Sequence, residues 1–579
     1  MRTLSIALSL FILLFISVSC ASPQREVAIK LVQTSDIHGN YFPYDYMKDM
    51  PSSGSFARIH SYLQAQRAEY GDNLLLFENG DLLQGQPSAY YYNFIDTLST
   101  HLAADMLNFM KFDAANLGNH DIETGRAVFE RWASDCNFPV LGANIIDTST
   151  EKPFFEPYAV YERDGVKIAV LGMITPAIPI WLAESLWQGL RFDDMETTAR
   201  HWMEVIRKKE KPDVIVGLFH AGQNAHTLGD AYRENASVEV AVNVPGFDVV
   251  LMGHDHMLES RKVANVQGDS VLLLNPANLG NYVAEVELTI VKKGKKLIDK
   301  TINGRVVSMD DFEVSQVFMD EFKEEESIVS EFVSKKIGNI SQTITTRDAY
   351  FGSSAFVDLI HSLQLAISGA QISLAAPLSF DASIAQGDIT VGDMFNLYKY
   401  ENMLYIMRLQ GKELKNLLEM SYALWTNQMT SPTDHLLFIR KDIYKGKTRY
   451  RFQNSSFNYD SAAGIIYTVD VTKPEGEKVT IYRLADGTPF DEEAYYTVAM
   501  NSYRGNGGGE LITKGAGLSK DELQSRMLVA TTKDLRYYLM EYIQEHQHIN
   551  PRALNQWKFI PEDWTKEAAK RDYKLLFNE

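Results

Sequence analysis

Five short polar motifs stand in the first half of the chain, and four of them clearly follow an apolar run. Short apolar runs bounded by turn residues are typical of buried strands, and helical stretches such as Phe56–Glu69 and Thr197–Lys209 lie between them. This alternation predicts an α/β domain in which sheet is buried between helices. The runs and the motifs after them are Ala28–Val32 with Asp36-Ile37-His38, Leu74–Phe77 with Gly80-Asp81, Phe112–Leu117 with Gly118-Asn119-His120-Asp121, Val214–Phe219 with His220, and Val249–Met252 with Gly253-His254-Asp255-His256.

The placement of these motifs predicts one shared site. Ligands of open α/β sheets bind beyond the carboxyl ends of the strands, so the separate segments deliver their side chains to one edge. Carboxylate, amide and imidazole groups without thiolates suit Mn, Zn, Co or Fe. Seven such groups are enough for two divalent ions with one bridging carboxylate, and two ions about 3.5–4 Å apart can clamp both oxygens of an in-line phosphoryl displacement. The seven are Asp36, His38, Asp81, Asn119, His220, His254 and His256.

The motif order resembles that of the calcineurin-like metallophosphoesterases, which carry Asp-x-His, Gly-Asp, Gly-Asn-His-Asp/Glu, His and Gly-His-x-His. Over residues 28–560 the chain resembles the secreted 5′-nucleotidase and 2′,3′-cyclic-nucleotide phosphodiesterase family. The resemblance implies two divalent metal ions, with Asp81 as the bridging ligand. It assigns Asp36, His38 and His256 to the first ion, and Asn119, His220 and His254 to the second.

The same resemblance implies a catalytic histidine that does not bind metal. His120 matches the residue that stabilises the developing charge or protonates the leaving oxygen. Its usual partner is an aspartate three positions on, and Glu123 stands there in this chain. Glutamate is one methylene longer than aspartate, but it keeps the carboxylate.

The chain has 579 residues, and the resemblance divides it into several parts. We expect a lipoprotein signal peptide over 1–20 and a four-layer α/β/β/α metallophosphoesterase domain over 28–310. A segment over 311–346 contains one long helix, predicted from the helical spacing of apolar residues over 314–337 with Gly338 as its stop. A mixed α+β substrate-binding domain over 347–560 and a charged tail over 561–579 complete the chain.

The first twenty residues predict export. Arg2 precedes the apolar run Leu4–Val18, which is too short for a comfortable membrane span. Cys20 stands where the acylated cysteine of bacterial lipoproteins does, although the usual leucine three residues earlier is missing. Cleavage by the ordinary signal peptidase near Cys20 is the alternative. Either interpretation predicts export to the cell envelope, and only lipidation would give membrane contact, through a lipid on Cys20.

Two segments of the second domain resemble the family's nucleoside-binding loops. They are Phe457-Asn458-Tyr459-Asp460 and the stretch from Asn501-Ser502-Tyr503-Arg504 through the glycines up to Gly509. In the family two aromatic rings sandwich the base, and stacking contributes about 1–3 kcal/mol per base. We expect Tyr459 and Tyr503 to be these rings, with Asn501 and Arg504 beside the substrate. The alternative is that both tyrosines are ordinary half-buried strand residues.

One difference from the family's sequence pattern affects which substrate we expect. Many 5′-nucleotidases carry a Gly-Gly-x-Arg segment whose arginine meets the phosphate, and the corresponding stretch here, 375–380, has no arginine. This keeps a 2′,3′-cyclic or broader specificity open beside 5′-nucleotidase activity. The function that we expect is metal-dependent hydrolysis of nucleotide phosphoesters. The alternatives are nucleotide-sugar hydrolysis, hydrolysis of other phosphate or sulfur esters, and a catalytically dead binding lipoprotein.

The charge of the chain limits the classes of partner that it can bind. The formal net charge of −19 argues against binding to a nucleic-acid polymer, which requires a basic footprint. It does not exclude a small anionic substrate, because metal ions can invert the local field in one cleft. We therefore expect a small nucleotide substrate and infer no obligate protein partner.

Overall fold

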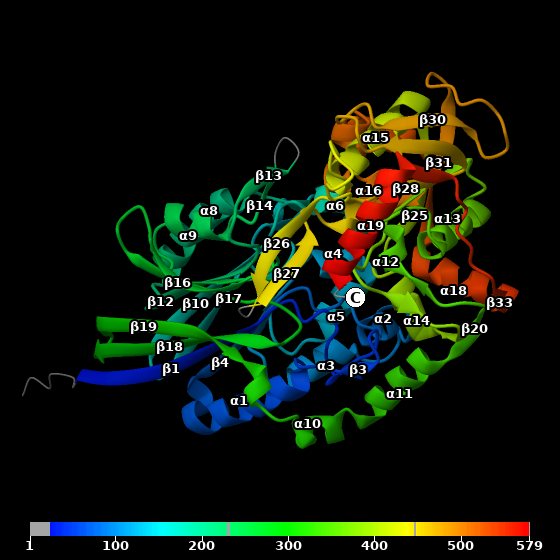
Figure 1. Ribbon diagram of the computed structural model, residues 1–579. Helices are drawn as coiled ribbons and strands as arrows, with labels where there is room; N and C mark the ends of the chain where they lie inside the picture. The colour runs from blue at the N-terminus through cyan, green and yellow to red at the C-terminus, as the bar shows by residue number, and fades with distance from the viewer. Residues whose placement is uncertain (1–23, 229–231, 445–446, 578–579) are drawn as a thin grey trace, which may run out of the picture.

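The structure is a computed structural model that describes residues 24–228, 232–444 and 447–577 (Figure 1). The predicted signal peptide and Cys20 lie outside these residues. Within the described part of the chain, no helix combines the length and the apolar character that a membrane crossing requires.

The first domain is built on two six-stranded sheets that pack face to face (Figure 1). The first sheet has the order β19 (Lys296–Ser308), β18 (Tyr282–Lys293), β1 (Gln24–Thr34), β4 (Leu74–Asn79), β5 (Ala114–Asn116), β6 (Val140–Leu141). The second has the order β16 (Leu258–Ala264), β17 (Ser270–Pro276), β15 (Val249–Met252), β12 (Val214–His220), β10 (Val166–Ile174), β9 (Tyr158–Arg163). The central strands of each sheet are parallel, so their carboxyl ends share one edge.

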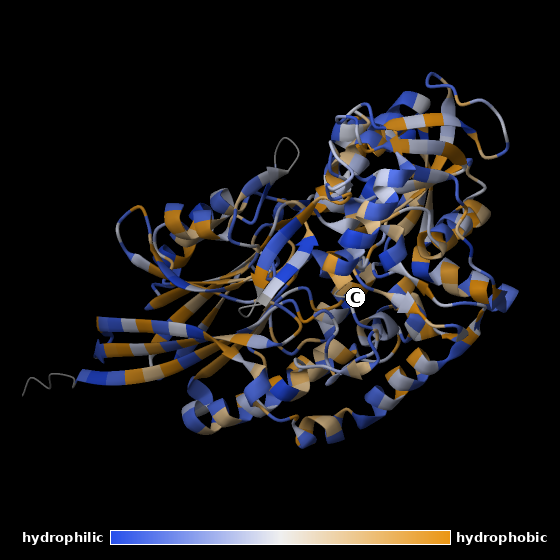
Figure 2. Ribbon diagram, viewed as in Figure 1, coloured by the Kyte–Doolittle hydropathy of each residue, from blue (hydrophilic) through white to orange (hydrophobic). Residues whose placement is uncertain are grey.

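Helices cover the outer face of each sheet. The first sheet packs on α1 (Phe56–Tyr70), α3 (Leu102–Phe109) and α5 (Arg126–Asp135), and the second on α8 (Met195–Lys209) and α9 (Ser237–Asn243). A separate apolar core, which includes Leu31 and Leu75 of the first sheet and Val170 and Val216 of the second, fills the space between the sheets. Figure 2 shows apolar stretches along the strands of both sheets, whereas the outer helices alternate in hydropathy. The predicted four-layer α/β/β/α architecture is confirmed.

The connection between the domains differs from the single helix predicted over 314–337. It consists of α10 (Gln316–Glu321), α11 (Lys323–Ser334) and then β20 (Lys336–Ile340), which run along one side of the molecule (Figure 1). Phe322 separates the two helices, because its backbone leaves the helical region while its ring packs into the core of the first domain. Gly338 is not a helix stop. It lies within β20, where a Cβ would approach Ile543 Cγ2 to 2.7 Å, so the glycine permits close packing.

The second domain is mixed α+β, as predicted. Its five-stranded sheet has the order β28 (Ser461–Ala463), β22 (Ile372–Ala375), β31 (Tyr495–Asn501), β25 (Met403–Gln410), β32 (Met527–Asp534). The main helices are α13 (Ala355–Ser368), α14 (Val391–Leu397), α15 (Gly411–Trp425) and α18 (Leu535–His546). A smaller sheet of β30 (Val479–Leu484), β29 (Ile465–Asp470) and β34 (Trp557–Ile560) packs beside them.

The charged terminal segment is part of this domain and not a tail outside it. It forms α19 (Glu562–Phe577), whose Ala568, Leu576 and Phe577 belong to the apolar core of the domain. Asp572 is fully buried and accepts a hydrogen bond from Leu437 N at 2.9 Å. The charged residues that suggested a tail occupy the solvent face of an amphipathic helix.

The packing of α19 predicts a stability effect. Leu576→Ala should lower the free energy of unfolding by about 2–5 kcal/mol, because it deletes buried apolar groups and leaves a cavity. Lys574→Ala, on the exposed face of the same helix, should change it by no more than about 0.5 kcal/mol. Urea unfolding monitored by circular dichroism measures both variants. Equal, small effects of the two substitutions would show that α19 does not stabilise the domain.

Candidate active site

The loops after β1, β4, β5, β12 and β15 meet at one edge of the two sheets. Asp36 N donates to Gly80 O at 2.9 Å and His38 N donates to Asp81 O at 2.9 Å, which joins the first two loops. Asn79 Nδ2 donates to Phe219 O at 3.0 Å and thereby joins the two sheets. The structure therefore brings all five motifs together, as the shared edge of parallel strands predicts.

Several of the predicted ligands have an unusual backbone. The left-handed residues are Asp36 (φ 54°), His38 (φ 51°), Asp81 (φ 56°), His254 (φ 74°) and His256 (φ 54°). This conformation is uncommon outside glycine, costs about 1–3 kcal/mol per residue and is concentrated at functional sites. The surrounding contacts must hold these residues in place.

A first group of ligand atoms comes from Asp36, His38, Asp81 and His256, and the atoms all lie within 4.8 Å of one another. His38 Nε2 is 3.1 Å from His256 Nε2, and His256 Nε2 is 3.3 Å from Asp36 Oδ1. Gln84 O lies 3.1 Å from His38 Nδ1, which favours a proton on Nδ1 and a free lone pair on Nε2. Imidazole nitrogens and carboxylate oxygens that face one another in this way fit a divalent cation.

A second group shares Asp81 and adds His220 and His254, again within 4.8 Å. His220 Nδ1 lies 2.6 Å from Asn79 O, so its Nε2 faces the site, 3.3 Å from Asp81 Oδ2 without hydrogen-bond geometry. Asn119 Oδ1 and His220 Nε2 are buried and have no hydrogen-bond partner within the described part of the chain. Because an unpaired buried polar atom costs about 1–3 kcal/mol, these orphaned atoms fit a cation that would satisfy them.

Asp81 is the residue that both groups share. It is 1% exposed, and its Oδ1 accepts a hydrogen bond from His120 N at 2.8 Å. Burial alone would raise the pKa of Asp81, but the neighbouring His220 and His120 outweigh burial and hold that pKa well below its ordinary value. Asp81 is therefore maintained as a carboxylate at the centre of the site.

Asp121, the residue after His120, fixes the loop that carries Asp81. Its carboxylate accepts hydrogen bonds from the backbone N–H groups of Asp81 at 2.8 Å, Leu83 at 2.7 Å and Gly118 at 2.7 Å. A Cβ at Gly118 would lie 2.1 Å from Asp81 Oδ1. The loops after β4 and β5 can approach this closely only because residue 118 is glycine.

His120 and Glu123 form a contact one turn apart on α4 (Asn119–Glu123). Their Nδ1 and Oε2 atoms lie 2.6 Å apart, so the longer glutamate side chain spans the distance. Burial opposes a charge on His120, but the carboxylates of Asp81 and Glu123 outweigh it and raise the pKa of His120 to about 9. The ring of Tyr400, from the second domain, lies parallel to the His120 ring at 6.5 Å.

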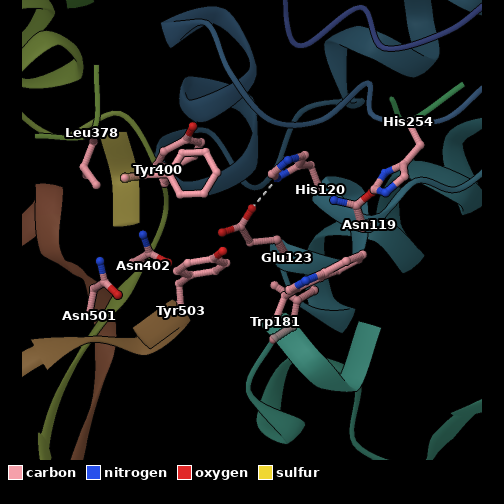
Figure 3. Close-up of a pocket in the computed structure, with 12 residues that line it drawn as sticks. Asn119, His120, Glu123, Trp181, His254, Leu378, Tyr400, Asn402, Asn501 and Tyr503 are labelled. Atoms are coloured by element: carbon pink, nitrogen blue, oxygen red, sulfur yellow. Dashed lines mark hydrogen bonds and ion pairs between the residues drawn. The ribbon is translucent and has the colours of Figure 1, made fainter. Parts of the chain in front are cut away.

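A cavity next to this dyad is lined by both domains (Figure 3). The first domain contributes Asn119, His120, Glu123, Trp181, Leu182 and His254, and the second contributes Leu378, Tyr400, Asn402, Phe457, Asn501 and Tyr503. Among the residues that the structure describes, no lysine or arginine lines this cavity. The cavity thus joins metal-ligating side chains to an aromatic and amide-rich wall.

Tyr459 does not line the cavity, and its predicted role as a base-stacking ring is wrong for this structure. Its side chain is fully buried, stacks on Trp425 at 5.4 Å with the rings 4° apart, and donates a hydrogen bond from its hydroxyl to Asn454 O at 2.9 Å. Phe457, two residues earlier, lines the cavity instead. The ring of Phe457 lies perpendicular to that of Tyr503 at 6.0 Å.

Arg504 is also placed differently from the prediction. It is 2% exposed and forms a bidentate ion pair with Asp460, with Nε–Oδ2 at 2.7 Å and Nη2–Oδ1 at 3.0 Å. Its Nη2 also donates to Phe457 O at 3.1 Å. Arg504 therefore holds the loop that presents Phe457 and does not face a ligand.

Asn501 and Tyr503 reach the cavity, as expected. The Oδ1 atom of Asn501 accepts a hydrogen bond from Arg504 N at 2.8 Å, because Asn501 caps α16 (Ser502–Gly505). Sequence reasoning missed Trp181, at the end of α6 (Ile178–Trp181), and Tyr400 and Asn402, in the loop before β25. No local sequence signal distinguishes these three residues.

Comparison with known families agrees with the geometry. The profile described as calcineurin-like phosphoesterase matches residues 29–258, and the one described as 5′-nucleotidase, C-terminal domain, matches residues 336–514. The chain belongs to the calcineurin-like phosphoesterases that carry a 5′-nucleotidase C-terminal domain. It is accordingly a metal-dependent phosphoester hydrolase.

Individual relatives cover nearly all of this chain. It is 28% identical over 602 residues to the trifunctional nucleotide phosphoesterase protein YfkN of Bacillus subtilis, covering 93% of this chain and 39% of the relative. It is 27% identical over 608 residues to the 2′,3′-cyclic-nucleotide 2′-phosphodiesterase/3′-nucleotidase of Salmonella typhimurium, covering 92% and 89%. The crystal structure of a putative 5′-nucleotidase from Staphylococcus aureus superposes with a TM-score of 0.74 at 20% identity, covering 92% and 99%, and confirms the fold.

The geometry predicts opposite metal contents for two variants. Asp81→Asn should abolish turnover and reduce bound metal, because the variant loses the carboxylate that both ligand groups share. His120→Asn should keep the metal and lose about 10²–10⁴-fold in kcat, the range for general acid catalysis. Elemental analysis and steady-state kinetics measure both. An active Asp81→Asn enzyme, or a folded His120→Asn protein without metal, would contradict the assignment.

Proposed function

We propose that this protein is a two-metal hydrolase of nucleotide phosphoesters, with 2′,3′-cyclic nucleotides as the favoured substrates. The observation that carries the proposal is that Asn119 and His254 line the same cavity as Phe457 and Tyr503. Groups that suit the phosphate and groups that suit the base thus lie within one site. Relatives named for 2′,3′-cyclic-nucleotide hydrolysis, at 24–27% identity over most of both chains, support the substrate class.

The two ligand groups would hold one divalent ion each. Asp36, His38 and His256 would hold the first ion, Asn119, His220 and His254 would hold the second, and Asp81 would contribute to both. When bound, the two ions activate water and neutralise the phosphate oxygens during in-line displacement. The presence of all seven residues counts against the alternative of a catalytically dead binding protein.

His120 would assist the departing oxygen. Its Nδ1 is occupied by Glu123, so its Nε2 remains for the substrate. The carboxylate of Glu123 orients the ring and favours its protonated form, which can donate a proton or a hydrogen bond to the leaving group. Glu123 thus replaces the aspartate that is usual at this position.

The base would stack on the second domain's aromatic residues. Phe457 and Tyr503 both line the cavity, with their rings at right angles to each other. Trp181 of the first domain lies near Tyr503 in the same cavity (Figure 3). Stacking tolerates different bases because every base has a π-face. This aromatic wall counts against a sulfur ester or a small phosphate ester as the main substrate.

The charge of the cavity favours a diester over a monoester. A phosphate monoester carries about two negative charges at neutral pH, because its second pKa is about 6. A cyclic phosphodiester has no such second ionisation and carries a single charge. No arginine stands in the stretch 375–380, and the cavity is lined by asparagine and tyrosine side chains but by no lysine or arginine among the described residues. The metal ions would therefore supply the positive charge that the phosphate requires.

A pair of variants tests the recognition of the base. Phe457→Ala and Tyr503→Ala should each lower kcat/KM for 2′,3′-cyclic AMP by an amount equivalent to about 1–3 kcal/mol. Both should leave the hydrolysis of bis(p-nitrophenyl) phosphate nearly unchanged, because that substrate has no base. Tyr459→Phe, which removes only a buried hydroxyl, is the matched control and should resemble wild type on both substrates. Equal losses on both substrates in folded variants would remove the support for nucleotide recognition.

We also propose that the protein is exported and held in the cell envelope by a lipid on Cys20. The wild-type protein should then partition with membranes, whereas Cys20→Ser should not. Fractionation of the expressing cells followed by immunoblotting measures the difference. Recovery of the wild type as a soluble mature protein would reject lipidation and leave cleavage by the ordinary signal peptidase.

A further inference from the structure

We propose that Glu234 is a positioning residue that orients His254 toward the second metal ion. His254 Nε2 lies 2.7 Å from Glu234 Oε1, and both side chains are largely shielded from solvent. Neither the motif set nor the family match assigns a role to Glu234, which stands 20 residues before His254. The inference rests on the two-metal site of the proposed function.

The chemistry of this contact fixes the tautomer of His254. A carboxylate oxygen can only accept a hydrogen bond, so the proton lies on Nε2 and the lone pair lies on Nδ1. A metal ion binds the nitrogen that carries the lone pair, and the partner of the other nitrogen sets which one that is. Glu234 therefore makes Nδ1 the ligand atom that His254 offers beside Asp81 and His220.

Other contacts hold Glu234 in place. It ends the hairpin of β13 (His226–Leu228) and β14 (Tyr232–Glu234), where it pairs with His226. Arg233, which precedes it and faces the opposite way, pairs with Glu196 of α8 at 3.1 Å and Glu239 of α9 at 2.9 Å. Successive strand residues face opposite sides, so this anchoring aims Glu234 at the site.

The residue that follows Glu234 is anchored as well. Asn235 has a left-handed backbone, with φ 59°, and its Oδ1 accepts a hydrogen bond from Gly222 N at 2.8 Å. Ser237 Oγ then donates to Ala221 O at 2.7 Å. Both bonds join this segment to the loop directly after His220, another ligand of the second ion. Glu234 therefore lies on a segment that is hydrogen-bonded to the loop after His220.

The other oxygen of Glu234 supplies a control. Its Oε2 lies 2.9 Å from His226 Nε2, and the His226 side chain is 51% exposed and belongs to neither ligand group. Removing His226 deletes a contact of the same carboxylate without touching His254. Carboxylates that orient a metal-binding histidine contribute about 10–100-fold to metal affinity. The two substitutions therefore separate an orienting role from a general role in hairpin stability.

The experiment compares metal retention by the holoenzyme, its Glu234→Gln variant and its His226→Gln variant. Each protein is dialysed against graded concentrations of a chelator, and the metal per chain is measured by elemental analysis. Glu234→Gln should lose one of its two ions at about 10–100-fold less chelator than wild type and keep the other unchanged. His226→Gln should follow the wild-type curve within twofold. Excess metal should restore most of the kcat of Glu234→Gln.

Three outcomes would overturn the inference. They are a wild-type retention curve for Glu234→Gln, an equal loss of both ions, and a matching loss in His226→Gln. Glu234→Asp, which keeps the charge and shortens the side chain, should give an intermediate curve and guards against a hairpin that fails to fold. A wild-type protein that binds a single ion would refute the two-metal function itself, whereas two tightly held ions in Glu234→Gln would refute only the role of Glu234.

Discussion

The buried carboxylate of Asp81 is the group around which both ligand sets are arranged. A charge at 1% exposure is costly, and the imidazoles of His220 and His120 together with the His120 backbone N–H compensate for it. Asp121 holds the loop that carries it by backbone hydrogen bonds. Because loops from both sheets must approach this one carboxylate, the left-handed backbones and Gly118 follow from its position.

The second domain completes the site across a defined interface. Lys520 Nζ donates to Pro179 O at 2.9 Å, Asn396 Nδ2 donates to Met47 O at 2.7 Å, and Tyr90 OH donates to Asp534 Oδ2 at 3.3 Å. These contacts hold Tyr400 parallel to His120 and keep the aromatic wall opposite the metal-binding edge. In the proposed function, phosphate chemistry and base recognition therefore fall mainly to different domains that share one cavity.

Electrostatics explains how an acidic chain can act on an anion. The chain has a formal net charge of −19, and within the described residues the cavity contains the carboxylate of Glu123 but no lysine or arginine. In the proposed two-metal site, the attraction for phosphate would then come from metal ions held at the strand ends and from a protonated His120. A site that depends on metals for its positive charge makes the orientation of every ligand, including His254, important for substrate binding.

That the seven candidate ligand residues come together was predictable from the sequence, because parallel strands place their carboxyl ends at one edge wherever the apolar runs fall. The same reasoning could not choose between Tyr459 and Phe457. They stand two residues apart, and the short 3₁₀ turn Ser456–Asn458 buries one ring against Trp425 and leaves the other in the cavity. Trp181, Tyr400 and Glu234 belong to no recognisable motif. The positions of Trp181 and Tyr400 depend on the interface between the domains, and that of Glu234 depends on a hairpin anchored by Arg233. The periodicity of apolar residues and the ends of strands can be recognised in the sequence itself. Contacts between distant segments form only when the domains pack, so the sequence does not reveal them.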